Sequence, residues 1–285
     1  MSEKVYKAYA KINITLDVLG KRDDGYHELE MIMQNVDLYD VVTVKKREGG
    51  IVLSSSRKDL PLDKGNIAYR AAELMFEKYG VQGGIEIDIE KHIPVAAGLA
   101  GGSTDGAAVI KAVNDLYELG LGEEELKNCA SQIGSDIPYC VAGKTSLATG
   151  RGTDLTYLAP MPKMYVVLAK PDIDVSTAFV YKNYKAENVE KRPETARMVD
   201  AVNRGDTKTI AEGLCNVLES VTTKHYPIIN EIKAKFIECG AVNSLMSGSG
   251  PTVFAVFEEK ETADKAAEEI KSIFGIEEVY SVATV

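Results

Sequence analysis

A stretch of small residues at positions 94–104, Pro-Val-Ala-Ala-Gly-Leu-Ala-Gly-Gly-Ser-Thr, constrains this chain more than any other feature. It follows an alternating run at 84–90 that predicts a strand, and it leads into apolar positions with helical spacing, for which Ser103 is the expected N-cap. Its three glycines let the backbone approach a ligand closely. Because a helix N-terminus offers unpaired amide hydrogens and a positive dipole end, this arrangement predicts an anion site.

A second interpretation of the loop is purely structural: a glycine-rich turn that lets a strand and a helix pack. The glycine spacing also differs from the GxxxxGK[ST] and GxGxxG phosphate loops. Composition narrows the partners, since a formal net charge of −10 argues against a nucleic-acid-binding protein, which needs a basic face. We therefore expect a small-molecule partner and no nucleic acid.

The cysteines and the hydropathy pattern indicate the compartment. The four cysteines are scattered without a CxxC pair or a histidine at ligand spacing, so we expect buried thiols and no metal-ligand cluster. The N-terminus carries charges where a signal peptide needs an apolar core, and no run approaches about 18 apolar residues. These features predict a soluble cytoplasmic protein without a membrane partner.

The periodicity along the chain predicts an α+β fold. Strands are expected at 5–18, 28–34, 41–45, 50–54, 84–90, 165–169, 242–246, 253–257 and 279–282, and helices at 66–79, 103–120, 123–133, 176–182, 193–203, 207–218, 226–239 and 262–274. Asp24-Gly25 is a strong turn signal. Prolines at 160 and 162 interrupt the pattern, so we expect two domains, 1–158 and 159–285.

Three segments, in order along the chain, resemble the three motifs of the GHMP kinases. Ala8-Tyr9-Ala10-Lys11-Ile12-Asn13 is similar to the first, Pro94 to Asp105 to the second, and Ser244-Leu245-Met246-Ser247-Gly248-Ser249-Gly250-Pro251-Thr252 to the third. One such motif would be weak, but the three together are specific, and the resemblance covers nearly the whole chain. Two departures stand out: Gly106 replaces a usual alanine, and Ala100 replaces a frequent glycine, so its φ is expected to be one that alanine tolerates.

The resemblance implies a two-domain fold and a reaction. The N-terminal domain would be ribosomal-protein-S5-like and carry ATP, and the C-terminal domain would be ferredoxin-like. The reaction would be ATP-dependent phosphorylation of a small-molecule alcohol, with Mg²⁺ bridging the phosphates. The resemblance assigns ATP to Pro94, Val95, Ala96, Ala97, Gly98, Leu99, Ala100, Gly101, Gly102, Ser103, Thr104 and Asn66, the last of which is by default a helix N-cap.

Lys11 and Asn13 point the same way on an alternating strand, and alone they would be read as a solvated face. Asp136 alone would be a local turn or cap residue. Phosphoryl transfer to an alcohol needs a base for the hydroxyl proton and a cation for the developing charge. The resemblance implies that Asp136 is the general base and that Lys11 is its partner, stabilising the transferring phosphoryl group.

The acceptor is indicated by Gly20-Lys21-Arg22 with Gly25-Tyr26-His27 and by Gly134-Ser135-Asp136-Ile137-Pro138. These segments most resemble family members that phosphorylate the 2-hydroxyl of a cytidine diphosphate-linked methylerythritol, in the non-mevalonate route to isoprenoid precursors. The resemblance implies that Tyr26 and a second aromatic stack on the cytosine while His27 reads its edge. Tyr181 is the expected second aromatic and Phe179 its competitor; further substrate contacts are expected from Asn13, Thr177, Ser247 and Gly248.

Two alternatives stay open on the sequence. Another GHMP kinase would keep the reaction but act on homoserine, mevalonate or a sugar. A nucleotide-binding regulator would keep the fold and lose catalysis, although the presence of both Lys11 and Asp136 argues against it.

Overall fold

The computed structural model describes residues 2–285 and divides into two compact units, each built from separate stretches of chain. Unit 1 comprises residues 2–10, 38–95 and 100–143 of the described chain. Unit 2 comprises residues 11–37, 96–99 and 144–285. Because each unit combines three separate stretches, the units do not correspond to one cut in the chain. The expected division into domains 1–158 and 159–285 remains a prediction.

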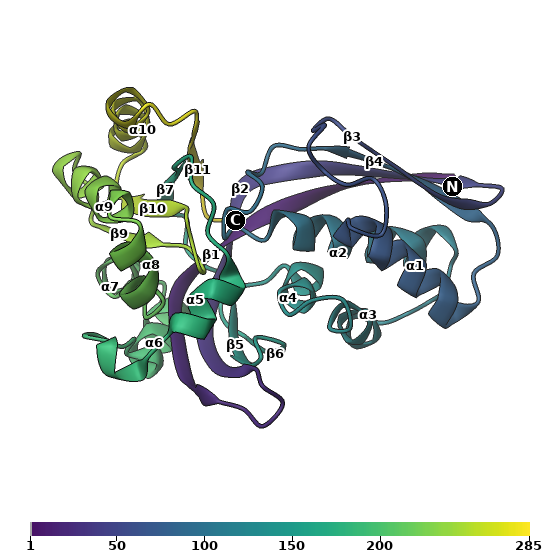
Figure 1. Ribbon diagram of the computed structural model, residues 1–285, viewed down its shortest axis with the longest axis horizontal. Helices are drawn as coiled ribbons and strands as arrows, with labels where there is room; N and C mark the ends of the chain where they lie inside the picture. Colours follow the sequence, from purple (N-terminus) through teal and green to yellow (C-terminus); the bar gives the residue numbers. More distant parts are fainter. Residues whose placement is uncertain (1) are drawn as a thin grey trace. The chain divides into compact units, whose positions relative to one another are not determined.

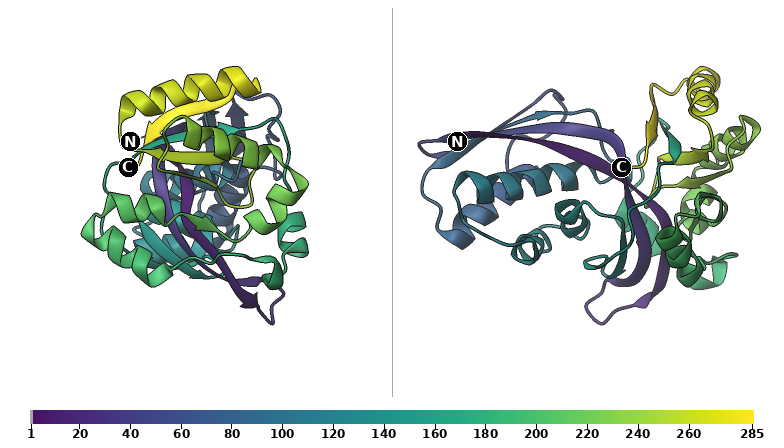
Figure 2. Two further views of the ribbon diagram at one scale, coloured as in Figure 1. Left: turned by 90° about the vertical axis from the view of Figure 1, so that its left-hand side faces the viewer. Right: turned by 180° about the vertical axis from the view of Figure 1, so that it is seen from behind.

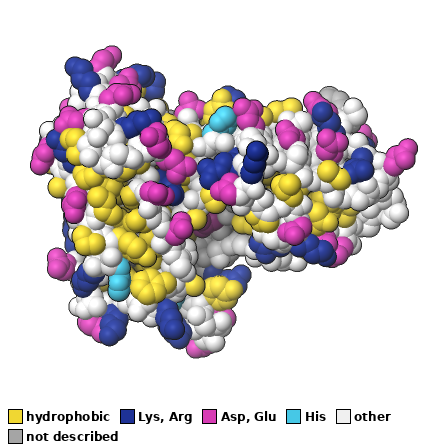
Figure 3. All heavy atoms as spheres, turned by 45° about the horizontal axis from the view of Figure 1, so that its top comes forward, with side chains coloured by type: hydrophobic (Ala, Val, Ile, Leu, Met, Phe, Trp, Pro, Cys, Tyr) yellow, Lys and Arg dark blue, Asp and Glu magenta, His cyan; other side chains and the backbone are white. Residues whose placement is uncertain are grey.

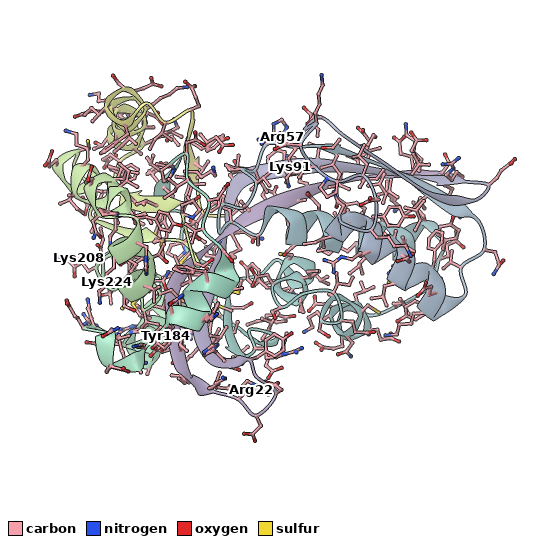
Figure 4. The ribbon with its side chains drawn as sticks, viewed as in Figure 1. Arg22, Arg57, Lys91, Tyr184, Lys208 and Lys224 are labelled. Atoms are coloured by element: carbon pink, nitrogen blue, oxygen red, sulfur yellow. The ribbon has the colours of Figure 1, made fainter. Side chains whose placement is uncertain are left out.

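A long hairpin opens the chain. β1 (Glu3–Lys21) turns into β2 (His27–Arg47) at the predicted Asp24-Gly25 turn, which the Arg22 amide closes onto the Tyr26 carbonyl at 2.8 Å; Figure 4 labels Arg22 at the tip of this hairpin. The two strands predicted at 28–34 and 41–45 are one strand. Residues 31–36 are all buried and burial then alternates from Val36 through Leu38, and nothing in 35–40 breaks an extended chain.

In unit 1, two helices cover one face of a sheet (Figure 1). β3 (Gly50–Ser55) runs parallel to β4 (Gly84–Glu90), which pairs antiparallel with the second half of β2. The helices are α1 (Ile67–Tyr79) and α2 (Gly101–Leu116), followed by the shorter α3 (Glu123–Ala130) and α4 (Ile137–Ala142). A Cβ on Gly106 would lie 2.7 Å from Ile67 Cγ2, so close packing of α1 on α2 explains the glycine that departs from the family pattern.

Unit 2 contains a four-stranded antiparallel sheet in the order β11-β7-β10-β9. Its strands are β7 (Tyr165–Lys170), β9 (Asn243–Met246), β10 (Val253–Phe257) and β11 (Glu278–Ala283). With α9 (Ile228–Glu238) after β7 and α10 (Lys260–Phe274) after β10, the chain follows the β-α-β-β-α-β order of the expected ferredoxin-like domain (Figure 2).

Unit 2 also includes short elements inserted between β7 and α9. They are α5 (Thr177–Asn183), a 3₁₀ turn at Ala186–Asn188, α6 (Thr195–Arg204), α7 (Thr207–Glu212), β8 (Cys215–Asn216) and α8 (Glu219–His225). β8 pairs in parallel with β1. β5 (Ser146–Gly150) extends the first half of β2 and carries β6 (Asp154–Tyr157) on its other edge.

Several of these elements differ from the periodicity-based expectation. The helix predicted at 207–218 is α7 followed by the two-residue strand β8, and α4, α8, β5 and β6 were not predicted. All are six residues or fewer except α8, which is too short to complete two helical turns. Windows of that length hold too few residues to establish a period.

On the face drawn in Figure 3, acidic and basic side chains are interspersed and neither sign forms a continuous patch. Among residues 2–285, no helix has the length and apolarity that crossing a bilayer requires.

Candidate active site

The glycine-rich loop enters α2 one turn earlier than predicted. The N-cap is Ala100, not Ser103, which lies inside the first turn. Ala100 has φ +58°, in the left-handed region, so the expectation of a φ comfortable for alanine is wrong; a Cβ there costs about 1–2 kcal/mol. Thr104 N donates to Ala100 O at 2.9 Å. The amides of the residues before it have no intrahelical acceptor and are available to an anion.

Residues 96–99 of the same loop belong to unit 2, where they contact the first motif. Lys11 N donates to Leu99 O at 3.1 Å, and Lys11 Nζ lies 3.3 Å from Gly98 O and 2.8 Å from Asn13 Oδ1. Lys11 and Asn13 are 4% and 1% exposed, so the interpretation of a solvated strand face does not hold. A buried ammonium directed by an amide and a carbonyl is positioned to interact with an anionic group.

The third motif packs against these same groups. Ser247 Oγ donates to Gly98 O at 3.0 Å, and a Cβ on Gly98 would lie 2.4 Å from Ser247 O. A Cβ on Gly248 would lie 3.6 Å from Lys11 Nζ. Glycine is therefore needed at position 98 both for this approach and for its φ of +75°. Unit 2 thus brings together Lys11, Asn13, Gly98, Ser247 and Gly248.

A support for the third motif comes from residues that the sequence did not single out. Asn216 Nδ2 donates to Met246 O at 2.8 Å and to Gly248 O at 2.7 Å, while its Oδ1 accepts from Leu218 N at 3.0 Å. Glu219 Oε1 accepts from Met246 N at 2.9 Å and from Lys233 Nζ at 2.7 Å. One buried asparagine thereby fixes both ends of the turn beside Lys11.

Helix α5 carries two of the residues predicted to bind the substrate that accepts the phosphoryl group, Thr177 and Tyr181. Thr177 in its first turn shares a hydrogen bond with Ser249 Oγ at 2.8 Å. Tyr181, one turn later, stacks on His27 with ring centroids 5.1 Å apart and an interplanar angle of 30°. Phe179 lies instead edge-on to His225 at 5.0 Å. Since four residues span about 6 Å of helix, α5 links the third motif to the aromatic pair.

His27, which is predicted to read the edge of the cytosine, lies between the aromatic rings of Tyr181 and Tyr184. Tyr184 contacts His27 edge-on at 6.4 Å, and its hydroxyl accepts from Arg192 Nη2 at 3.3 Å (Tyr184 is labelled in Figure 4). Burial, and then the positive charge of Lys21, lower the pKa of His27 below 6.5, so the ring is neutral at neutral pH. A neutral imidazole offers one donor and one acceptor nitrogen. Tyr26 is 53% exposed, with the Arg151 guanidinium 4.7 Å above its ring.

Two other predicted site residues lie in unit 1. Asn66 caps α1, accepting from Ala68 N at 2.9 Å as predicted, and it is 8% exposed. Asp136 stands at the N-cap position of α4, a helix that packs against α2 (Figure 1), yet its side chain makes no capping bond. Asp136 is therefore a turn residue, as the default interpretation had it, but its side chain does not cap the helix. Its assignment as the base remains a prediction.

Comparisons with known proteins agree with the motifs. The model of the GHMP kinases N terminal domain matches residues 66–144, and that of the GHMP kinases C terminal matches residues 198–276. A curated relative from Caldicellulosiruptor saccharolyticus, named 4-diphosphocytidyl-2-C-methyl-D-erythritol kinase, is 48% identical over 268 residues, covering 94% of this chain and 92% of that protein.

Solved structures give the same relationship. A crystal structure of a 4-(cytidine 5'-diphospho)-2C-methyl-D-erythritol kinase superposes with a TM-score of 0.84 at 31% identity, covering 99% of both chains. A homoserine kinase from Cytophaga hutchinsonii reaches a TM-score of 0.76 at 20% identity over 100% of this chain and 94% of its own, which shows the fold alone. Motifs, domain models and near full-length relatives agree, and the chain belongs to the GHMP kinase family.

Proposed function

We propose that this chain transfers the γ-phosphoryl group of ATP to the 2-hydroxyl of 4-diphosphocytidyl-2-C-methyl-D-erythritol, a step of non-mevalonate isoprenoid precursor synthesis. The observation that supports this choice of phosphoryl acceptor is the stack of Tyr181 on His27. It lies one helical turn from the hydrogen bond between Thr177 and Ser249 of the third motif. A cytosine has an aromatic face for stacking and a polar edge for hydrogen bonding. The relative at 48% identity is named 4-diphosphocytidyl-2-C-methyl-D-erythritol kinase, and its name supports the same acceptor.

The nucleotide would be held by the loop 94–104 and Asn66. Backbone amides at the start of α2 would bind the phosphates, since the N-terminal end of a helix favours negative charge. Ser103 and Thr104 add hydroxyl groups in the first turn. Asn66 would line the adenosine pocket from the start of α1.

Mg²⁺ fits this site as an ion carried by the nucleotide. Among the described residues, no group of three or more His, Cys, Asp or Glu side chains forms a protein cage. Magnesium commonly keeps several waters and binds through substrate phosphates, where it neutralises charge that develops during transfer. The loop hydroxyls and the nucleotide oxygens are the donor types that it prefers.

Asp136 would remove the proton of the 2-hydroxyl, and Lys11 would stabilise the transferring phosphoryl group. Lys11 is buried with its ammonium directed by Asn13 and Gly98 O, so its charge is little screened by solvent. Base catalysis is worth about 10²–10⁴ in rate. Asn13, Ser247 and Gly248 surround the lysine and would position the acceptor.

The test is turnover with defined acceptors. The purified chain, with ATP and Mg²⁺, is incubated separately with the proposed acceptor, homoserine, mevalonate and galactose, and the products are identified by mass spectrometry and ³¹P NMR. A new phosphomonoester on C2 of the methylerythritol is the expected result. Turnover of another acceptor, with none of the first, would overturn the proposal.

A further inference from the structure

Three charged side chains are buried together behind the start of α2. Lys91, in the segment after β4, is within hydrogen-bond reach of Asp40 on β2, and its Nζ lies 2.7 Å from Asp105 Oδ2 on α2 (Lys91 is labelled in Figure 4). All three side chains are 4% exposed or less. We call Asp40, Lys91 and Asp105 the carboxylate–lysine cluster. All of its members belong to unit 1.

The cluster touches the glycine-rich loop on both sides. Asp40 Oδ1 accepts from His92 N at 2.6 Å and Ile93 N at 2.8 Å, immediately before Pro94. Lys91 Nζ lies 3.0 Å from the position that a Cβ on Gly101 would occupy, at the first residue of α2. Asp105 belongs to the turn that follows. The cluster therefore fixes where the chain enters the loop and where it leaves it.

The charges of the cluster do not balance. Two carboxylates and one ammonium sum to −1, in a setting with little solvent to screen them. Asp105 Oδ1 is buried and has no hydrogen-bond partner in the described structure. Asp105 lies about 6 Å along the helix axis from Gly101, where the unpaired amides are. A net negative charge at that distance opposes an anion at the helix start.

We propose that the carboxylate–lysine cluster positions the nucleotide loop and takes up a proton when the phosphates of a nucleotide bind at the start of α2. This inference rests on the proposed function for the identity of the loop's ligand. The proton would reside on Asp105, as a neutral carboxyl group beside the Asp40–Lys91 pair. Proton uptake cancels the excess charge, so the anion is bound behind a neutral cluster.

The surroundings of Asp105 support this assignment. Desolvation and the adjacent Asp40 raise its pKa to about 7, although Lys91 acts in the opposite direction. The charged groups that face Asp105 are Asp40 from β2 and Lys91 from the segment after β4, while α1 presents the apolar Ile67 to this part of α2. The Glu90 and His92 side chains, 3.3 Å apart, are exposed at the surface.

Calorimetric binding of a non-hydrolysable ATP analogue with Mg²⁺ to the full chain tests the inference. Titrations at pH 7.5 in two buffers of different ionisation enthalpy give the number of protons taken up per nucleotide, and a series from pH 6 to 8.5 gives the affinities. Asp105→Asn is the test variant, because the amide keeps the shape and cannot take up the proton. Glu90→Gln is the matched control, since it removes an exposed carboxylate near the same loop.

The number of protons taken up per nucleotide is expected to be higher in the wild type and in Glu90→Gln than in Asp105→Asn, by at most one. Their affinity should fall, relative to that variant, by up to tenfold per pH unit above pH 7. Asp40→Asn serves as a second variant if Asp105→Asn does not fold. Without the charge of Asp40, Lys91 neutralises Asp105, and the extra proton should disappear as well.

Equal proton uptake by the wild type and either cluster variant would overturn the inference while leaving the proposed function intact. No nucleotide binding by the wild type at any pH would overturn both.

Discussion

Lys11 is a buried residue whose Nζ lies 2.8 Å from Asn13 Oδ1 and 3.3 Å from the backbone carbonyl of Gly98. We predict that Lys11→Met and Asp136→Asn each lower kcat by about 10²–10⁴, because one removes the charge proposed to stabilise transfer and the other removes the proposed base. Steady-state kinetics with saturating ATP measures this effect. Lys45→Met, at an exposed lysine paired with Glu3, is the control and should retain wild-type turnover.

A nucleotide-binding regulator without catalytic function would behave differently. It would show the same background ADP release in the wild type and in both active-site variants. Retained turnover in Asp136→Asn would exclude that carboxyl group as the base and leave the family assignment untouched.

Ala100 stores strain at the N-cap of α2. Its φ of +58° is a region in which a side chain clashes with the backbone and glycine does not. We predict that Ala100→Gly raises the free energy of unfolding by about 0.5–1 kcal/mol, after the greater flexibility of glycine in the unfolded chain is counted. Urea denaturation measures this. Ala107→Gly, inside α2, is the control and should lower stability by about 1 kcal/mol or more.

At the scale of single elements, α5 distinguishes two aromatic residues that the sequence left as competitors. Tyr181 stacks on His27, and Phe179 lies against His225. We predict that Tyr181→Ala weakens binding of CMP and raises KM for the cytidine acceptor by roughly 5- to 150-fold, the range expected for one lost base stack. Phe179→Ala should change these values little. The reverse ranking in an isothermal titration would reassign the stacking residue.

The segment from β8 to α8 holds the third motif in place. Asn216→Ala would leave two buried carbonyl groups without their donor, so we predict a loss of roughly 2 kcal/mol of stability and a lower kcat. Thr222→Val removes a hydroxyl that donates to Ser249 O at 3.2 Å and to Leu218 O at 3.4 Å, and it should cost less in both measurements. Equal kcat values for the two variants would contradict a role for Asn216 in shaping the turn beside Lys11.

The sequence predicted long periodic elements and the loop that precedes α2, but not what supports them. β1, β4, α1 and α10 follow clear alternation or helical spacing and were found close to their expected bounds. Asn216 lies in a two-residue strand, so no period marks it, and its partners are about thirty residues away. The Asp40–Lys91–Asp105 contacts also join residues far apart in the chain. Such contacts depend on tertiary packing, which local patterns do not contain.

The stability of the whole molecule should depend on the protonation of Asp105. Its pKa is about 7 in the folded chain against an ordinary 3.8, so the folded state binds the proton more tightly than the unfolded state does. The free energy of unfolding should therefore fall as the pH rises from about 4 to 7, and the whole penalty should be present above pH 7.

We predict that Asp105→Asn flattens this pH dependence and that its advantage over the wild type is largest above pH 7. Melting temperatures of both proteins between pH 4 and 8.5 measure it. His27 has a lowered pKa and acts in the opposite direction below pH 6.5, but it is present in both proteins and cancels from the difference. A difference that does not change with pH would contradict the assignment.

β1 and β2 each supply residues to both compact units, and so does the loop that precedes α2. The two units are therefore discontinuous in sequence, and no single cut in the chain separates them. A gene cut after codon 158 would give a C-terminal fragment in which β8 lacks its β1 partner, and an N-terminal fragment lacking the third-motif serine that bonds Gly98 O. Produced together, the two pieces should reassociate and recover turnover, as in a split reporter, whereas either piece alone should be inactive.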